Sequence, residues 1–408
     1  MLKNYVKMAC KVLLRRKYFT FVSLFAISFT LTILMAATTV LDHQFGPMPP
    51  ESRLDRTLCV FRMSLSGPRS QINSGAGYGF LDRYARGLPG VELMSIAGSH
   101  TEQVNSYHEG RKFKLHLRRT DGEFWKMMEF RFLEGGPFTA RDEKEGSFVA
   151  VINEATREKL FGDQPAVGRT LSLDGRSFRI AGVVANVPIF RMLTFADIWA
   201  PISTQTGDSY RTRLVGGFAG LFLARSTDDF PSIREEFAAR LRRVEYPGDS
   251  RYNQLTGEVD TYLASTARAS GTSKTVFVAF IVFLMVLFMV LPTVNLVSMN
   301  VSRILERSGE IGVRKAFGAS SGALVGQFIT ENIILTLFGG VLGLAGSMAL
   351  LGAVSLTGLV PYADFHVNFR VFLAGLGVTL FFGVFSGAWP AWRMSRLHVV
   401  EALRGGMR

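Results

Sequence analysis

Four long apolar runs mark the chain, at residues 18–41, 275–302, 332–360 and 371–392. A membrane-spanning helix needs about 20 mostly apolar residues, and each run is long enough. The first three contain no charged residue, and the second is apolar on all faces, which is rare for a core helix of a soluble protein. We therefore predict four transmembrane helices, over residues 18–41, 275–302, 327–356 and 371–392.

The first run also has features of a secretory signal peptide, because a basic segment precedes it and it contains the small pair Ala36–Ala37. The apolar core of a signal peptide, however, is only about 7–15 residues long. This run is clearly longer, so a retained membrane anchor is favoured over a cleaved leader.

The stretch between the first two runs, residues 42–274, has the mixed pattern of an α/β domain. Some segments alternate apolar and polar residues as half-buried strands do, and others have the 3.6-residue spacing of helices. One segment rich in Gly and Ser indicates a mobile loop. The expected elements are strands at 112–118, 148–152 and 216–223, a hairpin of 170–173 and 177–184 around Asp174–Gly175, helices at 154–161 (capped by Gly162) and 232–244, and the loop at 66–79.

The basic charge of the chain lies beside the apolar runs. The net charge is +13, and residues 1–17, 299–326 and 393–408 together contribute +11 of it. This distribution argues against nucleic-acid binding and follows the rule that Lys and Arg flank membrane helices on the cytoplasmic side. The rule places segments 1–17, 303–326 and 393–408 in the cytoplasm, and 42–274 and the short loop 357–370 outside.

The expected fold class is therefore an α-helical membrane protein with four transmembrane helices and one mixed α/β extracytoplasmic domain inserted between helices 1 and 2. It would lie in the bilayer of the cell (inner) membrane with both termini in the cytoplasm. Cys10 and Cys59 would then be on opposite sides of the membrane, which excludes a disulfide between them within one chain.

The sequence contains no recognisable catalytic motif. Segment 162–170 lacks the spacing of a phosphate-binding loop, and segment 75–79 matches the dinucleotide-binding fingerprint only loosely. His100, His108 and His116 recur every eight residues without carboxylates grouped beside them, so no zinc site is predicted. We expect no enzyme activity and no metal in this chain.

A charged segment, residues 300–319 (NVSRILERSGEIGVRKAFGA), follows the second apolar run directly. Apolar residues interrupt its charges, and Gly309, Gly312 and Gly318 suggest helices broken by tight turns. The residues alone leave three uses open. The segment could rest on the lipid surface, fix the topology, or dock into a groove of a soluble partner.

The same segment carries a family resemblance. Residues 306–320 (ERSGEIGVRKAFGAS) resemble the cytoplasmic motif of the MacB/FtsX-type permeases of ABC transporters, which usually reads close to E-R-x-x-E-I-G-[ILV]-R-[KR]-A-[LF]-G-A. Residues 390–404 (PAWRMSRLHVVEALR) resemble the C-terminal motif of that family. Residues 151–168 and 178–188 are similar to its extracytoplasmic domain. The resemblance covers nearly the whole chain in the same order.

The resemblance implies a device that transmits mechanical motion. A short cytoplasmic helix, here about residues 309–318, would sit in a cleft of a separate ABC ATPase subunit. That partner would use the ATP, and this chain would bind no cofactor. Two permeases, identical or different, would pair with two ATPases, and an extracytoplasmic adaptor or outer-membrane component is left open as a further partner. The residues expected to couple to the ATPase are Glu306, Arg307, Glu310, Ile311, Arg314, Lys315, Phe317 and Gly318.

Two expectations concern the membrane helices. Residues 268–275 contain no proline, so the second helix is expected to extend outward without a break. In the third helix, Gly339, Gly343 and Gly346 lie near one face, which is a packing signature of small residues. Packing within one chain and a seam between two permeases are equally compatible with that face.

The function expected from the resemblance is that of a permease subunit for export or release of a peptide, lipid-linked or drug-like substrate. The alternative is an FtsX-like relay that controls an extracytoplasmic partner such as a cell-wall hydrolase and transports nothing. A membrane-bound enzyme is a weaker alternative, because no catalytic set is clustered. Gly309 and Val400 depart from the family motifs. The stretch 186–274 has little match to the family, so substrate or partner contacts there are left open.

Overall fold

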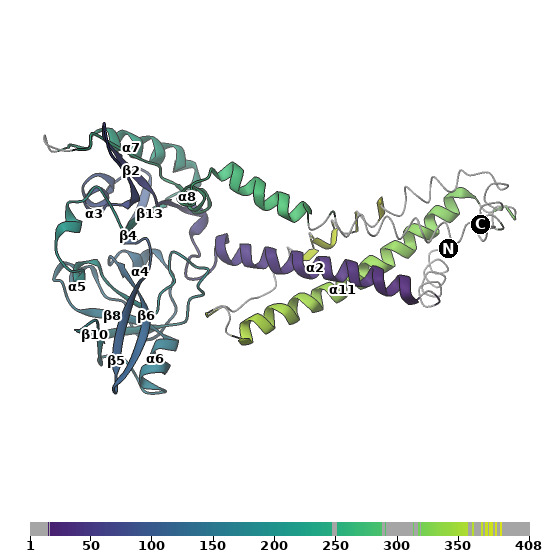
Figure 1. Cartoon of the computed structure of the whole chain (residues 1–408), viewed down its shortest axis with the longest axis horizontal. Coiled ribbons are helices and arrows are strands. Elements are labelled where there is room, and N and C mark those ends of the chain that lie inside the picture. Colours follow the sequence, from purple (N-terminus) through teal and green to yellow (C-terminus); the bar gives the residue numbers. More distant parts are fainter. Residues whose placement is uncertain are drawn as a thin grey trace. The chain divides into compact units, whose positions relative to one another are not determined.

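The computed structural model of the chain divides into two compact units (Figure 1). The helical unit combines residues 1–41, 279–359 and 365–408, and the sheet unit combines residues 42–278 and 360–364. The structure describes residues 15, 17–246, 251–287, 290, 313, 317–318, 320–357 and 361–362, together with single positions or short runs between 369 and 385.

Two long helices dominate the described part of the helical unit, α2 (Lys17–Phe45) and α11 (Ser321–Thr357). Each contains a segment that is long and apolar enough to cross a membrane, Thr20–Phe45 and Val325–Thr357. Much of the second and fourth predicted helices lies outside the described residues. The count of four transmembrane helices therefore remains a prediction.

The helix expected to run unbroken through residues 268–275 is interrupted, so that prediction was wrong. α8 (Tyr262–Ala269) ends there, and a separate helix, Lys274–Leu287, follows after a sharp bend. Gly271 adopts a φ of +81°, a conformation that ends helices as effectively as proline does. The Ser273 hydroxyl then accepts a hydrogen bond from the first turn of the next helix. The two helices form a third candidate span only if they are counted together.

The strands of the sheet unit form one hydrogen-bonded sheet. The strands are β1 (Thr57–Val60), β2 (Met63–Ser66), β3 (Gln71–Ala76), β4 (Val91–Gly98), β5 (Glu102–His108), β6 (Arg111–Thr120), β7 (Phe132–Gly135), β8 (Val149–Asn153), β9 (Thr170–Leu173), β10 (Arg176–Val184), β11 (Ile198–Pro201), β12 (Val215–Gly216), β13 (Phe218–Ala224), β14 (Gln254–Gly257) and β15 (Asp260–Thr261). The main path of strands runs β11-β8-β10-β9-β5-β6-β4-β13-β3-β2-β14, and β1, β7, β12 and β15 pair beside it. Most neighbours are antiparallel, but β10 is parallel to β8 and β11 is parallel to β6.

The sheet unit has two lobes that meet where β4 pairs with β6, at Ala97 and Thr120. Lobe A contains residues 57–98 and 202–262, lobe B contains residues 102–201, and each has its own apolar core. A third apolar core takes side chains from both lobes, Trp199 among them. Because burial of apolar surface is the main stabilising term in folding, this shared core holds the lobes together.

Helices cover both lobes. α7 (Phe230–Arg242) buries its apolar stripe in lobe A and confirms the helix predicted at 232–244. α6 (Glu154–Phe161) has the predicted bounds, and Gly162 ends it with a φ of +61°. The other helices of the sheet unit are α3 (Tyr78–Phe80), α4 (Phe124–Met127), α5 (Ala140–Lys144) and the single turns η1 (Leu54–Arg56), η2 (Leu81–Ala85), η3 (Ile202–Thr204), η4 (Ser209–Arg211) and η5 (Thr227–Asp229).

The strand predictions are confirmed, including the hairpin of β9 and β10. Its turn residues, Asp174 and Gly175, have φ values of 44° and 81°, and positive φ at both positions is what a two-residue hairpin turn requires. The strands predicted at 112–118, 148–152 and 216–223 lie in β6, β8 and the pair β12–β13.

The mobile loop expected at residues 66–79 is ordered structure instead, so that prediction was wrong. β3 occupies most of it and pairs with β2 on one side and β12 on the other. A Cβ added to Gly75 would lie 2.7 Å from the Gly216 carbonyl oxygen, and one added to Gly77 would lie 2.1 Å from that of Arg213. The glycines are therefore explained by close backbone packing.

Candidate functional site

The predicted coupling segment is mostly outside the described part of the chain. That applies to Glu306, Arg307, Glu310, Ile311, Arg314 and Lys315. The Phe317 side chain is described and is 88% exposed, and Gly318 follows with a φ of +88°. The Ser320 hydroxyl accepts a hydrogen bond from the Ala323 N–H and so caps the start of α11. The exposed Phe317 ring beside a tight turn is suited to docking into a partner. The contact of this segment with an ATPase subunit stays a prediction.

The three predicted packing glycines of α11 face α2 of the same chain. A Cβ added to Gly339 would lie 2.4 Å from the Ile27 side chain, and one added to Gly343 would lie 2.7 Å from Leu31 Cβ. A Cβ on Gly346 would be similarly close to the Thr32 hydroxyl, at 2.6 Å. The Thr32 hydroxyl also donates to the Gly343 carbonyl oxygen at 3.2 Å. This face is thus covered by packing within one chain.

Replacing Gly343 by leucine should weaken the α2–α11 packing, because the new side chain would overlap α2. Overpacking of this kind typically costs about 1–3 kcal/mol. Titration of the full-length protein with sodium dodecyl sulfate should show an earlier loss of helix pairing. The matched control is Gly352→Leu on the same helix, where an added Cβ has no neighbour within 4 Å. Equal effects of the two substitutions would contradict the assignment.

One edge of the sheet unit receives every described connection to the apolar helices. This attachment edge consists of residues 42–51, 186–197, 262–278 and 361–362. The Phe45 ring, in the last turn of α2, lies 5.7 Å from the Tyr262 ring and 6.1 Å from the Phe277 ring, measured between centroids. The exit of α2 and the start of helix Lys274–Leu287 are therefore packed onto the same aromatic group.

A buried ion pair fixes the chain that leaves α2. Glu51 is 2% exposed as a residue, and its Oε2 lies 3.1 Å from Arg191 Nη1. The same Arg191 nitrogen donates to the Gly46 carbonyl oxygen at 2.7 Å, and the Thr194 hydroxyl donates to Glu51 Oε1 at 2.8 Å. Burial raises the pKa of Glu51, and the charge of Arg191 opposes that rise. These contacts tie the α2 exit to segment 186–197 of lobe B.

Segment 186–197 also holds the described part of the outer loop. The Tyr362 hydroxyl donates to Asp197 Oδ1 at 2.8 Å, and the Ile189 N–H donates to the Pro361 carbonyl oxygen at 3.3 Å. Burial and the charge of Asp197 raise the pKa of Tyr362 to about 12, so its hydroxyl keeps its proton at neutral pH. One stretch of lobe B thus contacts two separate connections to the apolar helices.

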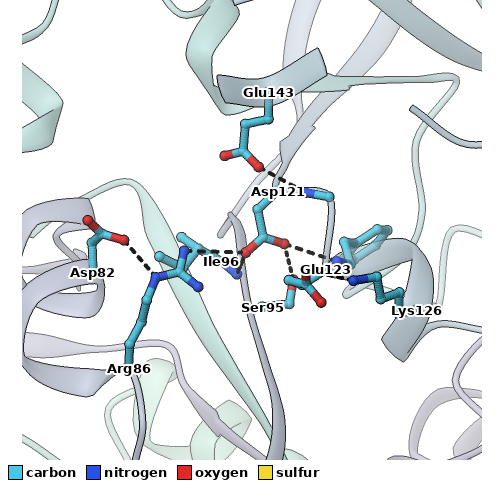
Figure 2. Close-up of polar contacts among 10 residues, drawn as sticks. Asp82, Arg86, Ser95, Ile96, Asp121, Glu123, Lys126 and Glu143 are labelled. Atoms are coloured by element: carbon cyan, nitrogen blue, oxygen red, sulfur yellow. Dashed lines mark hydrogen bonds and ion pairs between the residues drawn. The ribbon is translucent and has the colours of Figure 1, made fainter. Parts of the chain in front are cut away.

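Asp121 joins the two lobes at the point where β6 meets β4 (Figure 2). Its Oδ2 accepts the Ile96 N–H at 2.8 Å, and its own N–H donates to the Ile96 carbonyl oxygen at 3.0 Å, so the carboxylate continues the ladder beyond the last strand pair. Oδ1 accepts the Ser95 hydroxyl at 2.7 Å and the Phe124 N–H at 3.0 Å. Arg86 Nη2, held by Asp82, lies 3.9 Å from Oδ2.

A second carboxyl lies close to this junction. Glu143 of α5 accepts the Gly122 N–H at 2.9 Å, next to Asp121 in the chain (Figure 2). Burial raises the pKa of Asp121 to about 6, and burial together with the charge of Asp121 raises the pKa of Glu143 to about 7. The lobe junction therefore contains two carboxyl groups that titrate near neutral pH.

No pattern in the sequence indicates a role for Glu51, Arg191 or Asp121. The ion pair joins positions 140 residues apart, and no local pattern indicates such a contact. Asp121 is followed by Gly122, a pairing that indicates a turn, but its cross-lobe role depends on the fold. Within the described residues, no group of three or more His, Cys, Asp or Glu side chains could hold a metal.

The sheet unit and helical unit match two known protein families. A model described as the MacB-like periplasmic core domain matches residues 20–240, and one described as the FtsX-like permease C-terminal matches residues 282–399. A crystal structure of the periplasmic region of MacB from Actinobacillus actinomycetemcomitans is 15% identical, covers 50% of this chain and 88% of that chain, and gives a TM-score of 0.36.

Two relatives illustrate the range of similar proteins. The uncharacterized ABC transporter permease YknZ of Bacillus subtilis (strain 168) is 23% identical over 363 residues, which cover 85% of this chain and 88% of YknZ. The macrolide export ATP-binding/permease protein MacB of Burkholderia cenocepacia (strain HI2424) is 28% identical over 288 residues, 69% of this chain, and the chain spans only 40% of that protein. The two family matches together account for most of the sequence, and the chain belongs to the MacB/FtsX family of ABC transporter permeases.

Proposed function

We propose that this chain is a permease subunit that couples ATP hydrolysis by a separate ATPase subunit to motion of its extracytoplasmic domain. The observation that carries the proposal is the attachment edge. Within that edge, the exit of α2 packs against the start of helix Lys274–Leu287 and is hydrogen bonded to segment 186–197. The described outer loop is hydrogen bonded to the same segment. Displacement of the α2 exit or of the outer loop would be passed to segment 186–197 of lobe B, and displacement of helix Lys274–Leu287 would reach it through Phe45.

The route from the edge into the domain is stiff. The Glu51–Arg191 pair and its hydrogen bonds are buried, and Arg118 of β6 donates to the carbonyl oxygens of Phe195 and Met192 in segment 186–197. Buried side chains that are hydrogen bonded in a densely packed interior resist local deformation. A push on the α2 exit would therefore move lobe B as a body.

The cargo class we propose is a peptide, lipid-linked or drug-like molecule that is exported or released at the outer face. The names of the MacB relatives, which describe macrolide export, support the drug-like option. In those relatives an ATP-binding part and a permease part are named together as one protein. For this chain, the ATPase would be a separate protein that grips residues 306–318, and two permeases would pair in the assembly.

Charge reversal in the coupling segment should weaken binding of the ATPase. We expect Glu310→Arg and Arg314→Glu each to reduce co-purification of the ATPase by at least about tenfold, because truncated hot-spot contacts commonly cost 2 kcal/mol or more. The control is Glu145→Arg, an exposed site on the sheet unit, which should co-purify as the unmodified chain does. Binding that survives changes along the whole 306–318 face would overturn the coupling proposal.

A vesicle assay separates transport from a regulatory relay. The permease and its ATPase are reconstituted together, and movement of a labelled macrolide or lipopeptide is followed with ATP and with a non-hydrolysable analogue. ATP-dependent movement that is lost in Glu310→Arg supports export or release. ATP hydrolysis that changes protease accessibility of the sheet unit without moving any cargo would favour the relay.

A further inference from the structure

A cavity of about 430 Å³ lies in the sheet unit, against the attachment edge. Its floor is the sheet at β4 and β13, where Ala97, Gly98 and Ala219 are small. α8 forms one wall with Ala269 and Ser270, which are also short side chains. The space therefore exists because small residues face each other across the gap. A volume of this size falls in the range of natural ligand pockets, about 300–1,000 Å³.

One side of the cavity is aromatic and aliphatic. Phe61 and Phe277 line it together with Tyr262, and the rings of Phe61 and Tyr262 pack edge to face at 5.7 Å. Leu193 and Leu221 complete this apolar side. Phe277 lies in the first turn of the helix that begins at Lys274, so the apolar side adjoins the point where the chain leaves for an apolar helix.

The other side of the cavity is polar and carries a buried positive charge. Arg118 lines the cavity and is only 3% exposed. Its guanidinium donates to the carbonyl oxygens of Gly98, Phe195 and Met192, which uses three of its five N–H groups. Among the described residues, no carboxylate lies within ion-pair distance of it; burial lowers the pKa of Arg118, and the more distant charge of Glu51 opposes that fall. Ser99 and His100, which follow Gly98 in the chain, also line the cavity.

Tyr262 adds an unsatisfied group. Its side chain is nearly buried, at 3% exposure, and its hydroxyl has no hydrogen-bond partner among the described residues. A buried hydroxyl without a partner is unfavourable, and proteins usually avoid it. A ligand oxygen in the cavity would supply an acceptor for this hydroxyl and for the free N–H groups of Arg118.

We propose that this cavity binds a single-chain amphiphile with an anionic head group. The head would face Arg118, Ser99 and the Tyr262 hydroxyl, and the acyl chain would lie between α8 and the aromatic side toward Phe277. Two observations select this class. A buried cation with no carboxylate at ion-pair distance favours an anionic partner, and an apolar wall next to the membrane connections favours a chain that arrives from the bilayer.

The proposal goes beyond transport coupling, because binding in this cavity requires neither an ATPase nor ATP. It also names one class of ligand, an anionic single-chain amphiphile. A free anion such as phosphate would satisfy the charge but leave the apolar side without contacts. A neutral or cationic amphiphile would fill the apolar side but leave Arg118 unpaired. The probes below distinguish these cases.

The test uses the full chain in phosphatidylcholine nanodiscs without any ATPase. A photoreactive diazirine analogue of palmitate is added, the sample is irradiated, and labelled peptides are mapped by mass spectrometry. We expect labels in segments 192–193 and 262–270, displaced by palmitate but not by hexadecyltrimethylammonium or inorganic phosphate. Labels confined to the long apolar helices would overturn the proposal, as would equal displacement by the cationic amphiphile.

Cavity-filling variants give the second arm of the test. Ala269→Trp adds a large side chain at an exposed position of the cavity wall. We expect labelling of segment 192–193 to fall about tenfold. That decrease corresponds to a loss of ~1.4 kcal/mol in binding free energy. Ala140→Trp on α5 is the matched control, since this exposed alanine does not line the cavity. Ser270→Phe repeats the test at a second exposed wall position. Unchanged labelling in both cavity-filling variants would overturn the proposal that the amphiphile binds in this cavity.

Discussion

Replacing Arg191 by methionine should destabilise the sheet unit by about 3–5 kcal/mol, the cost of leaving a buried charge without its partner. Arg191 is 2% exposed and Glu51 is equally buried, so water cannot replace the lost guanidinium. The Gly46 carbonyl oxygen would lose its donor as well. Hydrogen exchange of β8 and β10 in the full chain, followed by mass spectrometry, would measure the loss.

The charge of Glu51 is the cause we assign to this effect, and a second substitution isolates it. Glu51→Gln in the Arg191→Met background removes the uncompensated carboxylate, so at least half of the lost stability should return. The surface pair of Arg211 and Asp208 provides the control, because both side chains are half exposed or more. Arg211→Met should change stability by less than about 1 kcal/mol. No recovery in the double variant would show that packing, and not charge, governs the site.

The effect of Arg191→Met should also depend on pH. Burial already raises the pKa of Glu51 in the folded protein, and losing Arg191 removes the main group that opposes the rise. A carboxyl with a raised folded-state pKa is most stabilising below its unfolded pKa and loses that contribution as pH rises through the folded value. The Arg191→Met variant should therefore approach the unmodified chain in stability as the pH falls.

Local features of the fold could be predicted from the sequence. Gly162 ends α6 and Asp174–Gly175 turns the hairpin because their positive φ is a property of those residues themselves. The apolar stripe of α7 is likewise readable from spacing alone. These predictions held because no distant contact was needed to decide them.

The wrong predictions involve glycines whose role composition does not reveal. Gly75 and Gly77 look like parts of a flexible loop, but they are required by backbone approaching from residues 213–218. Gly271 stands in a proline-free segment and still ends α8. Composition cannot separate a flexible glycine from one that close packing or a helix end demands.

The candidate site also has one part that the sequence indicated and one part that it did not. A contiguous motif indicated the coupling segment 306–318 directly. The attachment edge, in contrast, brings together Glu51, Arg191 and Tyr362 from three distant parts of the chain. Such a site is visible only after folding, because its residue types are ordinary and their spacing in the sequence carries no pattern.

The sheet unit should become less stable as pH rises from about 4 to about 7, through the two carboxyls of the lobe junction. Burial raises the pKa of Asp121 from 3.8 to about 6 and that of Glu143 from 4.5 to about 7. Each group binds its proton more tightly in the folded state, so its contribution is complete below the unfolded pKa and lost as pH rises through the folded pKa. A shift near two pH units corresponds to about 2–3 kcal/mol at Asp121.

Asp121→Asn tests this origin, because asparagine cannot titrate. The stability of the unmodified sheet unit should fall between pH 4.5 and pH 7.5, and the slope should be clearly smaller in Asp121→Asn. The variant should also be less stable at every pH, since its amide nitrogen replaces one of the two oxygens and cannot accept the N–H donated there, that of Ile96 at Oδ2 or that of Phe124 at Oδ1. Glu145→Gln, which removes a carboxyl of an exposed ion pair, should keep the slope of the unmodified chain. An unchanged slope in Asp121→Asn would mean that other groups set the pH dependence, and the lobe junction would then be a structural clamp without a titrating role.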